Sequence, residues 1–373
     1  IQMVDLKSQY DFIKQEVAVT MDEVLKTTSF INGPMVQAFQ SDLEAYLGVK
    51  HVIPCANGTD ALQIALMGLQ LVPGDEVITA DFTFAATVEV ISLLKLKPVL
   101  VDVDPKTFNI DPKAIEKAIT PKTKAIIPVH LFGQCADMDS ILEIANKHDL
   151  AMVEDNAQGI GATHTFEDGT KAKTGTLGHI SATSFFPSKN LGAYGDGGAI
   201  FTNDDDLAHF IRGIVNHGMY TRYYHDVVGV NSRLDALQAA ILKVKLQYLD
   251  FYNERRKEAA IRYTNYFKNH DQLITPFRSR DCDSHVFHQY TLRVLKADRD
   301  ALVAHLNKNQ IPCGVYYPVP LHAQKAYADP SVDPANFPVT NQLVKEVISL
   351  PMHSELTTDQ IEYIASTVLD FFN

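Results

Sequence analysis

The sequence is short of cysteine and of positive charge, and each shortage excludes a class of protein. Its four cysteines form no CxxC pair and match no zinc or redox spacing, so we expect isolated thiols, no metal site and a reducing cytoplasm. Lysine and arginine number 33 against 45 aspartates and glutamates, which gives a formal net charge of −12. Such a chain lacks the basic surface that nucleic-acid binding requires, although a small anion can still bind in a locally positive pocket.

Long apolar runs, a signal-peptide pattern and internal repeats are also missing from the sequence. We therefore expect no membrane partner. The chain nevertheless has 373 residues, of which 46% are hydrophobic. That is enough for a large core and more than one domain usually holds, so two domains are expected.

Short β-branched runs alternate with helical patterns in the first two thirds of the chain. The runs are almost continuously apolar, as strands are when both faces of a sheet are covered. Strands are expected over 76–80, 98–103, 124–129, 151–155, 182–186 and 198–202, and helices over 59–69, 111–119 and 139–148. This alternation predicts an α/β fold with a mainly parallel sheet, whose ligand site lies at the carboxyl ends of the strands.

The pattern changes after Asn231. Apolar residues from Leu234 to Tyr248 mark one side of a long helix that continues toward Tyr266. Further on, the sequence predicts strands over 285–295 and 313–319 and a helix over 298–308. We therefore expect a large ligand-binding domain at 1–245 and a smaller C-terminal α/β domain at 246–373.

Two motifs at predicted strand ends carry candidate chemistry, and each is weak alone. Asn57-Gly58 is a turn that leads into a helix at Thr59, where unpaired backbone amides favour a phosphate, although a simple cap is the commoner role. Asp155 ends a strand, where its carboxylate could pair with a protonated ring nitrogen or merely cap the next turn.

A third motif surrounds Lys189. This lysine follows a strand closely and precedes a glycine-rich stretch, so its amine could form an imine with the aldehyde of a cofactor. Ser184, at the end of the same strand, could donate its hydroxyl to a phosphate. An exposed loop lysine is the ordinary alternative, but the order of all three motifs along one sheet favours a shared site.

That order resembles the fold-type-I pyridoxal-phosphate (PLP) enzymes of the DegT/StrS nucleotide-sugar aminotransferase family. The resemblance covers nearly the whole chain. The matching segments are VDLK (4–7), NGP (32–34), NGTDAL (57–62), PGDEVIT (73–79), FTFAAT (82–87), EDNAQ (154–158), SFFPSK (184–189), GDGGA (195–199), GVNSRLDALQAA (229–240) and YPVPLH (317–322).

The resemblance implies a role for each matching residue around the PLP ring. Lys189 would be the Schiff-base lysine and the proton shuttle, and Asp155 would pair with the pyridine nitrogen. Gln158 would lie close to the ring hydroxyl. Phe84 would stack on the ring face, although a core aromatic is the commoner use.

The resemblance also implies how the phosphate is held and how two chains share a site. Gly58, Thr59 and Ser184 would hold the phosphate. Asn231 would reach the phosphate from the partner subunit and Arg233 would follow it toward the substrate, which implies a homodimer. Without the resemblance, these last two residues would be only the start of the following helix.

The implied reaction moves an amino group from L-glutamate to a nucleotide-linked keto-sugar, for polysaccharide or glycoconjugate synthesis. The variants of the motifs resemble the branch that aminates C3 of a UDP-sugar, with an N-acetylated uronate as the preferred acceptor. Tyr316, Tyr317 and His322 would contact the substrate. The family often has alanine at the position of Asn156, which is a tolerated loop change. Relatives that act on uronates often carry a histidine at the position of Tyr316, so the sugar stays open.

Other functions on the same fold compete with this reaction. Sugar dehydratases of the family carry histidine at the lysine position, so Lys189 counts against that activity. A non-catalytic sensor or regulatory protein could dispense with Lys189 or Asp155, and this chain has both. A PLP enzyme for amino acids alone would need no large sugar site.

Overall fold

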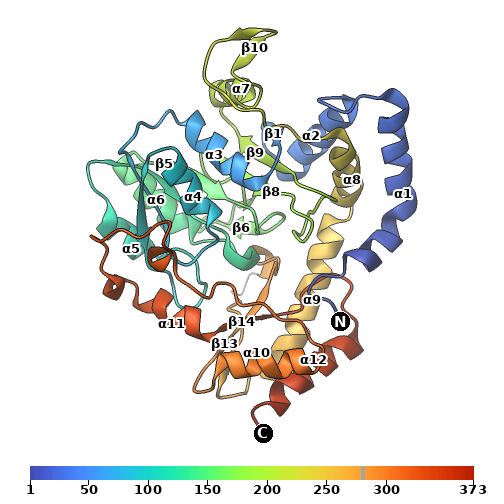
Figure 1. Ribbon diagram of the computed structural model, residues 1–373, viewed down its shortest axis with the longest axis vertical. Coiled ribbons are helices and arrows are strands. Elements are labelled where there is room, and N and C mark those ends of the chain that lie inside the picture. The colour runs from blue at the N-terminus through green and yellow to red at the C-terminus, as the bar shows by residue number, and fades with distance from the viewer. Residues whose placement is uncertain (279–281) are drawn as a thin grey trace.

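A mostly parallel seven-stranded sheet forms the centre of the larger part of the molecule (Figure 1). The computed structural model describes residues 1–278 and 282–373. Strand β9 alone runs antiparallel to its two neighbours in this sheet. In spatial order the strands are β1 (His51–Cys55), β9 (Gly198–Thr202), β8 (Ile180–Ser184), β5 (Ala151–Asp155), β4 (Thr123–Ile127), β2 (Glu76–Ala80) and β3 (Lys97–Val101).

Helices cover both faces of this sheet, which explains why its strands are so uniformly apolar. In β4, Ile126 packs into the core on one face, whereas Ala125 and Ile127 pack into the core on the other. The helices of these two cores are α5 (Pro112–Ala118) and α6 (Met138–His148) on one face, and α3 (Gly58–Gly68), α4 (Ala86–Leu93) and α7 (Asp205–Ile214) on the other. The predicted α/β fold with a mainly parallel sheet is confirmed.

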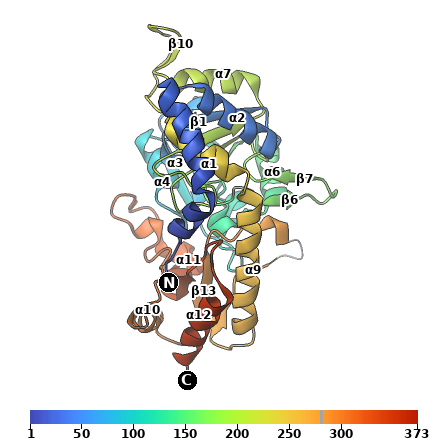
Figure 2. The same ribbon diagram turned by 90° about the vertical axis from the view of Figure 1, so that its right-hand side faces the viewer.

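A helical layer closes the β1–β9 end of the sheet. It consists of α1 (Leu6–Thr27), α2 (Pro34–Leu47) and α8 (Ala236–Leu246), and α9 (Leu249–Phe267) leads away from it (Figures 1 and 2). The prediction of one long helix here is wrong, because the helix is interrupted at Tyr248, where φ is −105° and ψ is 1°. Leu246, Leu249 and Tyr252 are buried on both sides of the break, so the apolar stripe in the sequence runs on across it.

The C-terminal part builds a core of its own. Three antiparallel strands, β12 (Leu273–Ile274), β13 (Tyr290–Val294) and β14 (Val347–Leu350), pack with α9, α10 (Arg299–Lys308) and α12 (Thr358–Asp370). Helix α11 (Pro338–Glu346) instead returns Leu343 to the core of the large sheet. The domain boundary at 245/246 stays a prediction.

The predicted strand over 313–319 is wrong. Only Gly314 pairs there, with Ser349, because Pro312, Pro318 and Pro320 have no N–H to offer a sheet. The segment therefore runs as a loop along the large domain. Within the described residues, no helix has the length and hydrophobicity needed to cross a membrane.

Two small hairpins complete the fold. One consists of β6 (Thr163–Thr165) and β7 (Lys171–Lys173). The other consists of β10 (Met219–Thr221) and β11 (Tyr224–His225), and it projects from the body of the molecule beyond α7 (Figures 1 and 2). The tip of this second hairpin is strongly exposed, with Tyr223 at 74%.

Candidate active site

A cavity of about 650 Å³ lies at the carboxyl ends of the parallel strands, where the sequence placed the ligand site. The turn after β1, the segment after β2 and the ends of β5 and β8 all contribute to it. Nine residues singled out in the sequence line this cavity: Gly58, Thr59, Phe84, Asp155, Gln158, Ser184, Lys189, Tyr316 and Tyr317.

One end of the cavity is built to receive an anion. The Asn57 side chain caps α3 by accepting a 2.8 Å hydrogen bond from the Asp60 amide, which leaves the amides of Gly58 and Thr59 at the helix start. Helix α3 approaches β8 so closely that a Cβ on Gly58 would lie 2.5 Å from the Ser184 Cβ. Glycine is therefore required at this point, and it lets the helix start meet the Ser184 hydroxyl.

Asp155 is held rigidly at the end of β5. Its Oδ2 accepts a 2.8 Å hydrogen bond from the Thr87 hydroxyl, and its Oδ1 accepts a 3.1 Å bond from the Ala157 amide. Burial raises the pKa of Asp155, whereas these two hydrogen bonds and the charge of Lys189 oppose the rise. A carboxylate that stays ionised here would attract a cationic group in the cavity.

Lys189 supplies an amine to the same cavity. Its backbone amide donates a 2.8 Å bond to the Phe186 carbonyl, so a tight turn carries the side chain back over the end of β8. Burial lowers the pKa of Lys189 to about 8, and the Asp155 charge opposes that shift. A substantial share of the amine is therefore neutral near physiological pH and able to act as a nucleophile or base.

Another part of the cavity wall is formed by Gln158, Tyr317 and Phe84. The Gln158 Oε1 accepts a 2.7 Å bond from the Phe132 amide, so its Nε2 points toward the Tyr317 hydroxyl at 3.5 Å. The ring of Phe84 lies 6.3 Å from that of Tyr317, and Phe84 is 57% exposed. A large aromatic left this exposed at a cavity rim is suited to cover a flat ligand.

His288 lines the cavity and was not singled out in the sequence, where it appeared only within a predicted strand. The Asn190 Nδ2 donates to the Asn253 Oδ1 and the Val286 carbonyl, so the Asn190 Oδ1 faces His288 and accepts a 3.3 Å bond from its Nδ1. Burial lowers the pKa of His288 well below its ordinary range, and the charge of Lys189 adds to the effect. His288 is therefore a neutral imidazole with an unprotonated Nε2.

Two threonines of the FTFAAT segment were also missed. The buried Thr83 hydroxyl lines the cavity without a hydrogen-bond partner in the described structure, and Thr87 holds Asp155. The FTFAAT segment carries the signal that could have found them, because it matches the family and both threonines lie within three residues of Phe84.

Three predicted site residues do not line the cavity of this chain. Asn231 is exposed and Arg233 is partly buried, both just before α8. His322 is bonded to Asp81 outside the cavity lining. Their assigned roles stay predictions.

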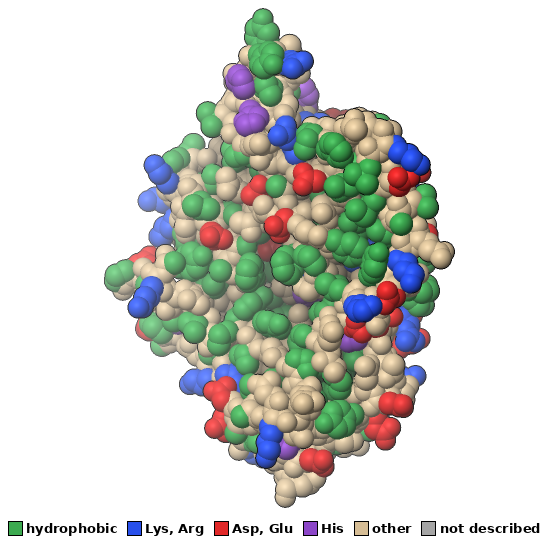
Figure 3. Space-filling view, turned by 45° about the vertical axis from the view of Figure 1, so that its right-hand side comes forward, with side chains coloured by type: hydrophobic (Ala, Val, Ile, Leu, Met, Phe, Trp, Pro, Cys, Tyr) green, Lys and Arg blue, Asp and Glu red, His purple; other side chains and the backbone are tan. Residues whose placement is uncertain are grey.

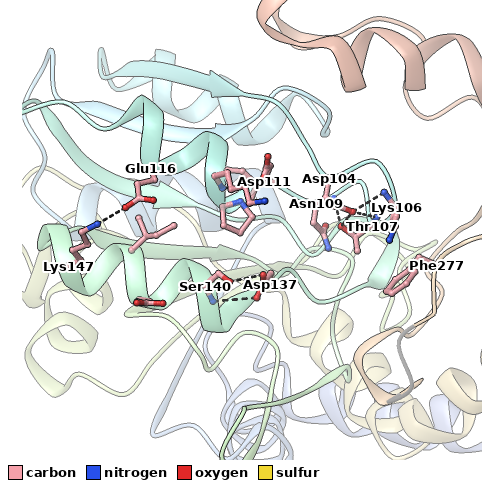
Figure 4. A pocket seen from close by; sticks show the side chains of 15 residues that line it. Asp104, Lys106, Thr107, Asn109, Asp111, Glu116, Asp137, Ser140, Lys147 and Phe277 are labelled. Carbon is pink, nitrogen blue, oxygen red and sulfur yellow. Dashed lines mark hydrogen bonds and ion pairs between the residues drawn. The ribbon is translucent and has the colours of Figure 1, made fainter.

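A second cavity, of about 550 Å³, lies between α5, α6 and the loop after β3, and it offers no comparable chemistry (Figure 4). Several of its charged side chains are already engaged within the protein. Glu116 and Lys147 form a 2.6 Å ion pair, and Asp137 caps α6 through Ser140. The first cavity is therefore the candidate active site.

The residues of the first cavity fit the groups that PLP presents. The start of α3 and Ser184 suit a phosphate, Asp155 suits a ring nitrogen that carries a proton, and Lys189 suits an aldehyde. The buried Thr83 hydroxyl has no hydrogen-bond partner within the described residues, so it is available to bond a polar group of a ligand in the cavity.

Comparison with known proteins agrees with this fit. Residues 11–369 match the DegT/DnrJ/EryC1/StrS aminotransferase family. A "pleiotropic regulatory protein" of Geobacillus stearothermophilus is 47% identical, over 100% of this chain and 98% of its own length. The UDP-2-acetamido-2-deoxy-3-oxo-D-glucuronate aminotransferase of Pseudomonas aeruginosa is 46% identical, over 99% of each chain. The solved structure of ntda from Bacillus subtilis, with the cofactor PMP bound, is 33% identical, with a TM-score of 0.87 over 95% of this chain and 81% of that one.

Proposed function

Because the chain belongs to the DegT/DnrJ/EryC1/StrS aminotransferase family, we propose that it transfers an amino group to a nucleotide-linked keto-sugar with PLP as its cofactor. The observation that carries the proposal is one cavity that joins the buried carboxylate of Asp155 to the amine of Lys189 and to an anion-binding helix start. Such a reaction needs a carrier that takes the amino group from the donor and passes it to the acceptor, and these groups would hold that carrier.

Each end of PLP would have its own partner in the cavity. Gly58, Thr59 and Ser184 would hold its phosphate, Asp155 its ring nitrogen and Lys189 its aldehyde carbon. When bound, PLP supplies an electron sink that stabilises negative charge on the carbon bearing the amino group.

The side chains of the protein itself move the proton and orient the ligand. When it is not attached to the cofactor, the Lys189 amine would take a proton from the α-carbon of the amino donor, because burial lowers its pKa to about 8. Asp155 stays fixed by Thr87 and Ala157 during this transfer. Phe84, at the rim, would shield the reacting carbon from water.

We propose L-glutamate as the donor and C3 of a UDP-linked keto-sugar as the acceptor. The relative from Pseudomonas aeruginosa is named for a 3-oxo-glucuronate substrate and aligns over almost the full length of both chains. Tyr316 and Tyr317 line the cavity and would contact the sugar. The product would serve the synthesis of polysaccharides or glycoconjugates.

We also propose that two chains share each site. Hydrophobic side chains gather over one face of the molecule and at the tip of the β10–β11 hairpin (Figure 3). Phe84 and Phe186, both at the cavity, are 57% and 52% exposed, so the cavity rim presents apolar surface that a partner chain would cover. Because Asn231 and Arg233 do not line the cavity of their own chain, they are free to reach that of a partner.

A regulatory protein without catalysis is the second candidate, and the name of the Geobacillus relative favours it. Absorption spectra of purified protein with PLP, before and after L-glutamate, separate the two functions. The enzyme shows a visible band that glutamate converts to the pyridoxamine form, and Lys189→Ala lacks that band. A wild-type protein without any band in excess PLP would overturn the aminotransferase proposal.

A further inference from the structure

Asp81 and His322 are joined by a buried pair of hydrogen bonds beside the active site. The Asp81 Oδ2 lies 2.7 Å from the His322 Nδ1, and its Oδ1 accepts a 2.8 Å bond from the His322 backbone amide. The Asp81 carbonyl also accepts a bond from the Leu321 amide. Both side chains are almost inaccessible, at 0% for Asp81 and 5% for His322. The contact is therefore fixed by three hydrogen bonds and shielded from solvent.

His322 has little left with which to bind a substrate. Its Nδ1 is engaged by Asp81, and one face of its ring stacks on Phe337 at 4.6 Å between ring centres. It is also absent from the cavity lining. With one ring nitrogen bonded to Asp81 and one ring face packed on Phe337, the imidazole is placed to fix neighbouring residues and has little surface left for a ligand.

The pair connects the two segments that form one wall of the cavity. Phe82 follows Asp81 directly, and its ring meets that of Tyr317 edge-on at 5.9 Å. Tyr317 lies five residues before His322 in the loop that proved not to be a strand. The segments 81–84 and 316–322 are thus joined at two points, by aromatic contact at the cavity and by the carboxylate–imidazole pair beyond it.

We propose that His322 is a positioning residue, which through Asp81 holds the Phe84 and Tyr316–Tyr317 wall in the geometry that the sugar substrate requires. The loop has no sheet partner beyond Gly314, so side-chain contacts set its distance from β2, and the carboxylate–imidazole pair is the polar contact among them that joins it to the end of β2. A shift of about 1 Å in such a wall can cost about a hundredfold in rate. The catalytic part of this inference rests on the proposed function.

The structure offers a matched control for stability. Asp102, at the end of neighbouring β3, accepts bonds from the Val339 and Thr340 amides and from the Thr340 hydroxyl at 2.8–2.9 Å. This contact also ties a strand end to the C-terminal segment, but neither partner lines the cavity. Thr340→Val therefore weakens a similar buried tether without touching the wall.

The main variant is His322→Phe, which keeps a flat ring against Phe337 and removes the Nδ1 donor. His322→Asn restores a donor close to the Nδ1 position and serves as the conservative rescue. If the unpaired Asp81 charge prevents folding of His322→Phe, the double variant with Asp81→Asn removes that charge. Steady-state kinetics with both substrates is combined with hydrogen exchange of the 316–322 amides in cofactor-free protein.

We expect His322→Phe to lower kcat/KM for the keto-sugar by about ten- to a hundredfold, with less than about threefold change in the glutamate half-reaction. Exchange of the Leu321 and His322 amides should accelerate, and His322→Asn should recover both readouts. Thr340→Val should leave kcat/KM for the sugar close to wild type, even where its thermal stability is lowered as much as that of His322→Phe.

Three results would overturn the inference. Equal sugar losses in His322→Phe and Thr340→Val would reduce the pair to a stability element. Protected amides in His322→Asn together with lost sugar activity would make the ring itself a substrate contact. If wild-type protein aminates no sugar, the proposed function fails instead, and unchanged exchange in His322→Phe would then also remove the tether.

Discussion

The Thr87 hydroxyl donates a 2.8 Å hydrogen bond to Oδ2 of Asp155, and the two side chains come from different elements of the large domain. Thr87 is in the first turn of α4 and is completely buried, whereas Asp155 ends β5. The bond lowers the pKa of a carboxyl that burial would otherwise raise further. Thr87 thus helps Asp155 stay charged and aimed at one point of the cavity.

Thr87→Val should therefore impair catalysis without changing the shape of the core. A hydrogen bond to a charged group contributes about 1.5–3 kcal/mol, so we expect a loss of about ten- to a hundredfold in kcat. The pKa of Asp155 should rise, so the loss should grow toward acidic pH. Steady-state pH profiles test this, with Thr87→Ser as the variant that retains the hydroxyl. An unchanged profile in Thr87→Val would show that Ala157 alone suffices to hold Asp155.

Gly58→Ala should weaken PLP binding by crowding the anion end of the cavity. The added Cβ would lie 2.5 Å from the Ser184 Cβ and 3.1 Å from its Oγ, so the helix start or Ser184 must move. We expect the dissociation constant of PLP to rise at least about tenfold, which is roughly 1.4 kcal/mol. Spectroscopic titration with PLP measures it.

Gly195→Ala is the matched control for that prediction. At Gly195 the nearest atom to an added Cβ is the Gln238 Nε2, at 3.0 Å, which need move by only a few tenths of an ångström. Its PLP affinity should stay close to that of wild type. Equal affinities in both variants would argue that the phosphate is held elsewhere.

The fold was largely predictable because burial on both faces leaves a direct trace in sequence. Strands β2, β5 and β9 have the predicted bounds, since their residues are almost all buried and turn residues follow them. The same logic failed for the helix through Tyr248 and for the loop at 313–319. In both segments the apolar pattern correctly indicates which residues are buried, but it does not show where the backbone hydrogen bonding is interrupted.

The site was predictable only in part. Asp155 ends β5 and Lys189 lies in the turn after β8, so topology brings them to one edge of the sheet. Thr87 and His288 approach the cavity from a helix and from the C-terminal part, and no local pattern links them to it. His322 matched the family motif, but its pairing with Asp81 spans 241 positions of the chain and could be seen only in the fold.

The pKa of Lys189 gives a direct pH prediction for cofactor-free protein. Only the neutral amine attacks an aldehyde, and burial lowers the pKa of Lys189 to about 8. The rate of PLP attachment should therefore rise about tenfold per pH unit below pH 8 and level off above it. Stopped-flow absorbance measures this rate, with a free alkylamine as the reference for an unshifted amine. A rate that still climbs steeply between pH 9 and 10 would contradict the lowered pKa.

Mixing two inactive variants tests whether Arg233 serves the site of a partner. Lys189→Ala and Arg233→Ala chains each lack one component, and in a mixed dimer one site receives intact Lys189 from one chain and intact Arg233 from the other. Random exchange makes half of the dimers mixed, each with one good site, so activity should recover to about a quarter of wild type. Activity that stays at the level of the separate variants after proven subunit exchange would place Arg233 in the site of its own chain.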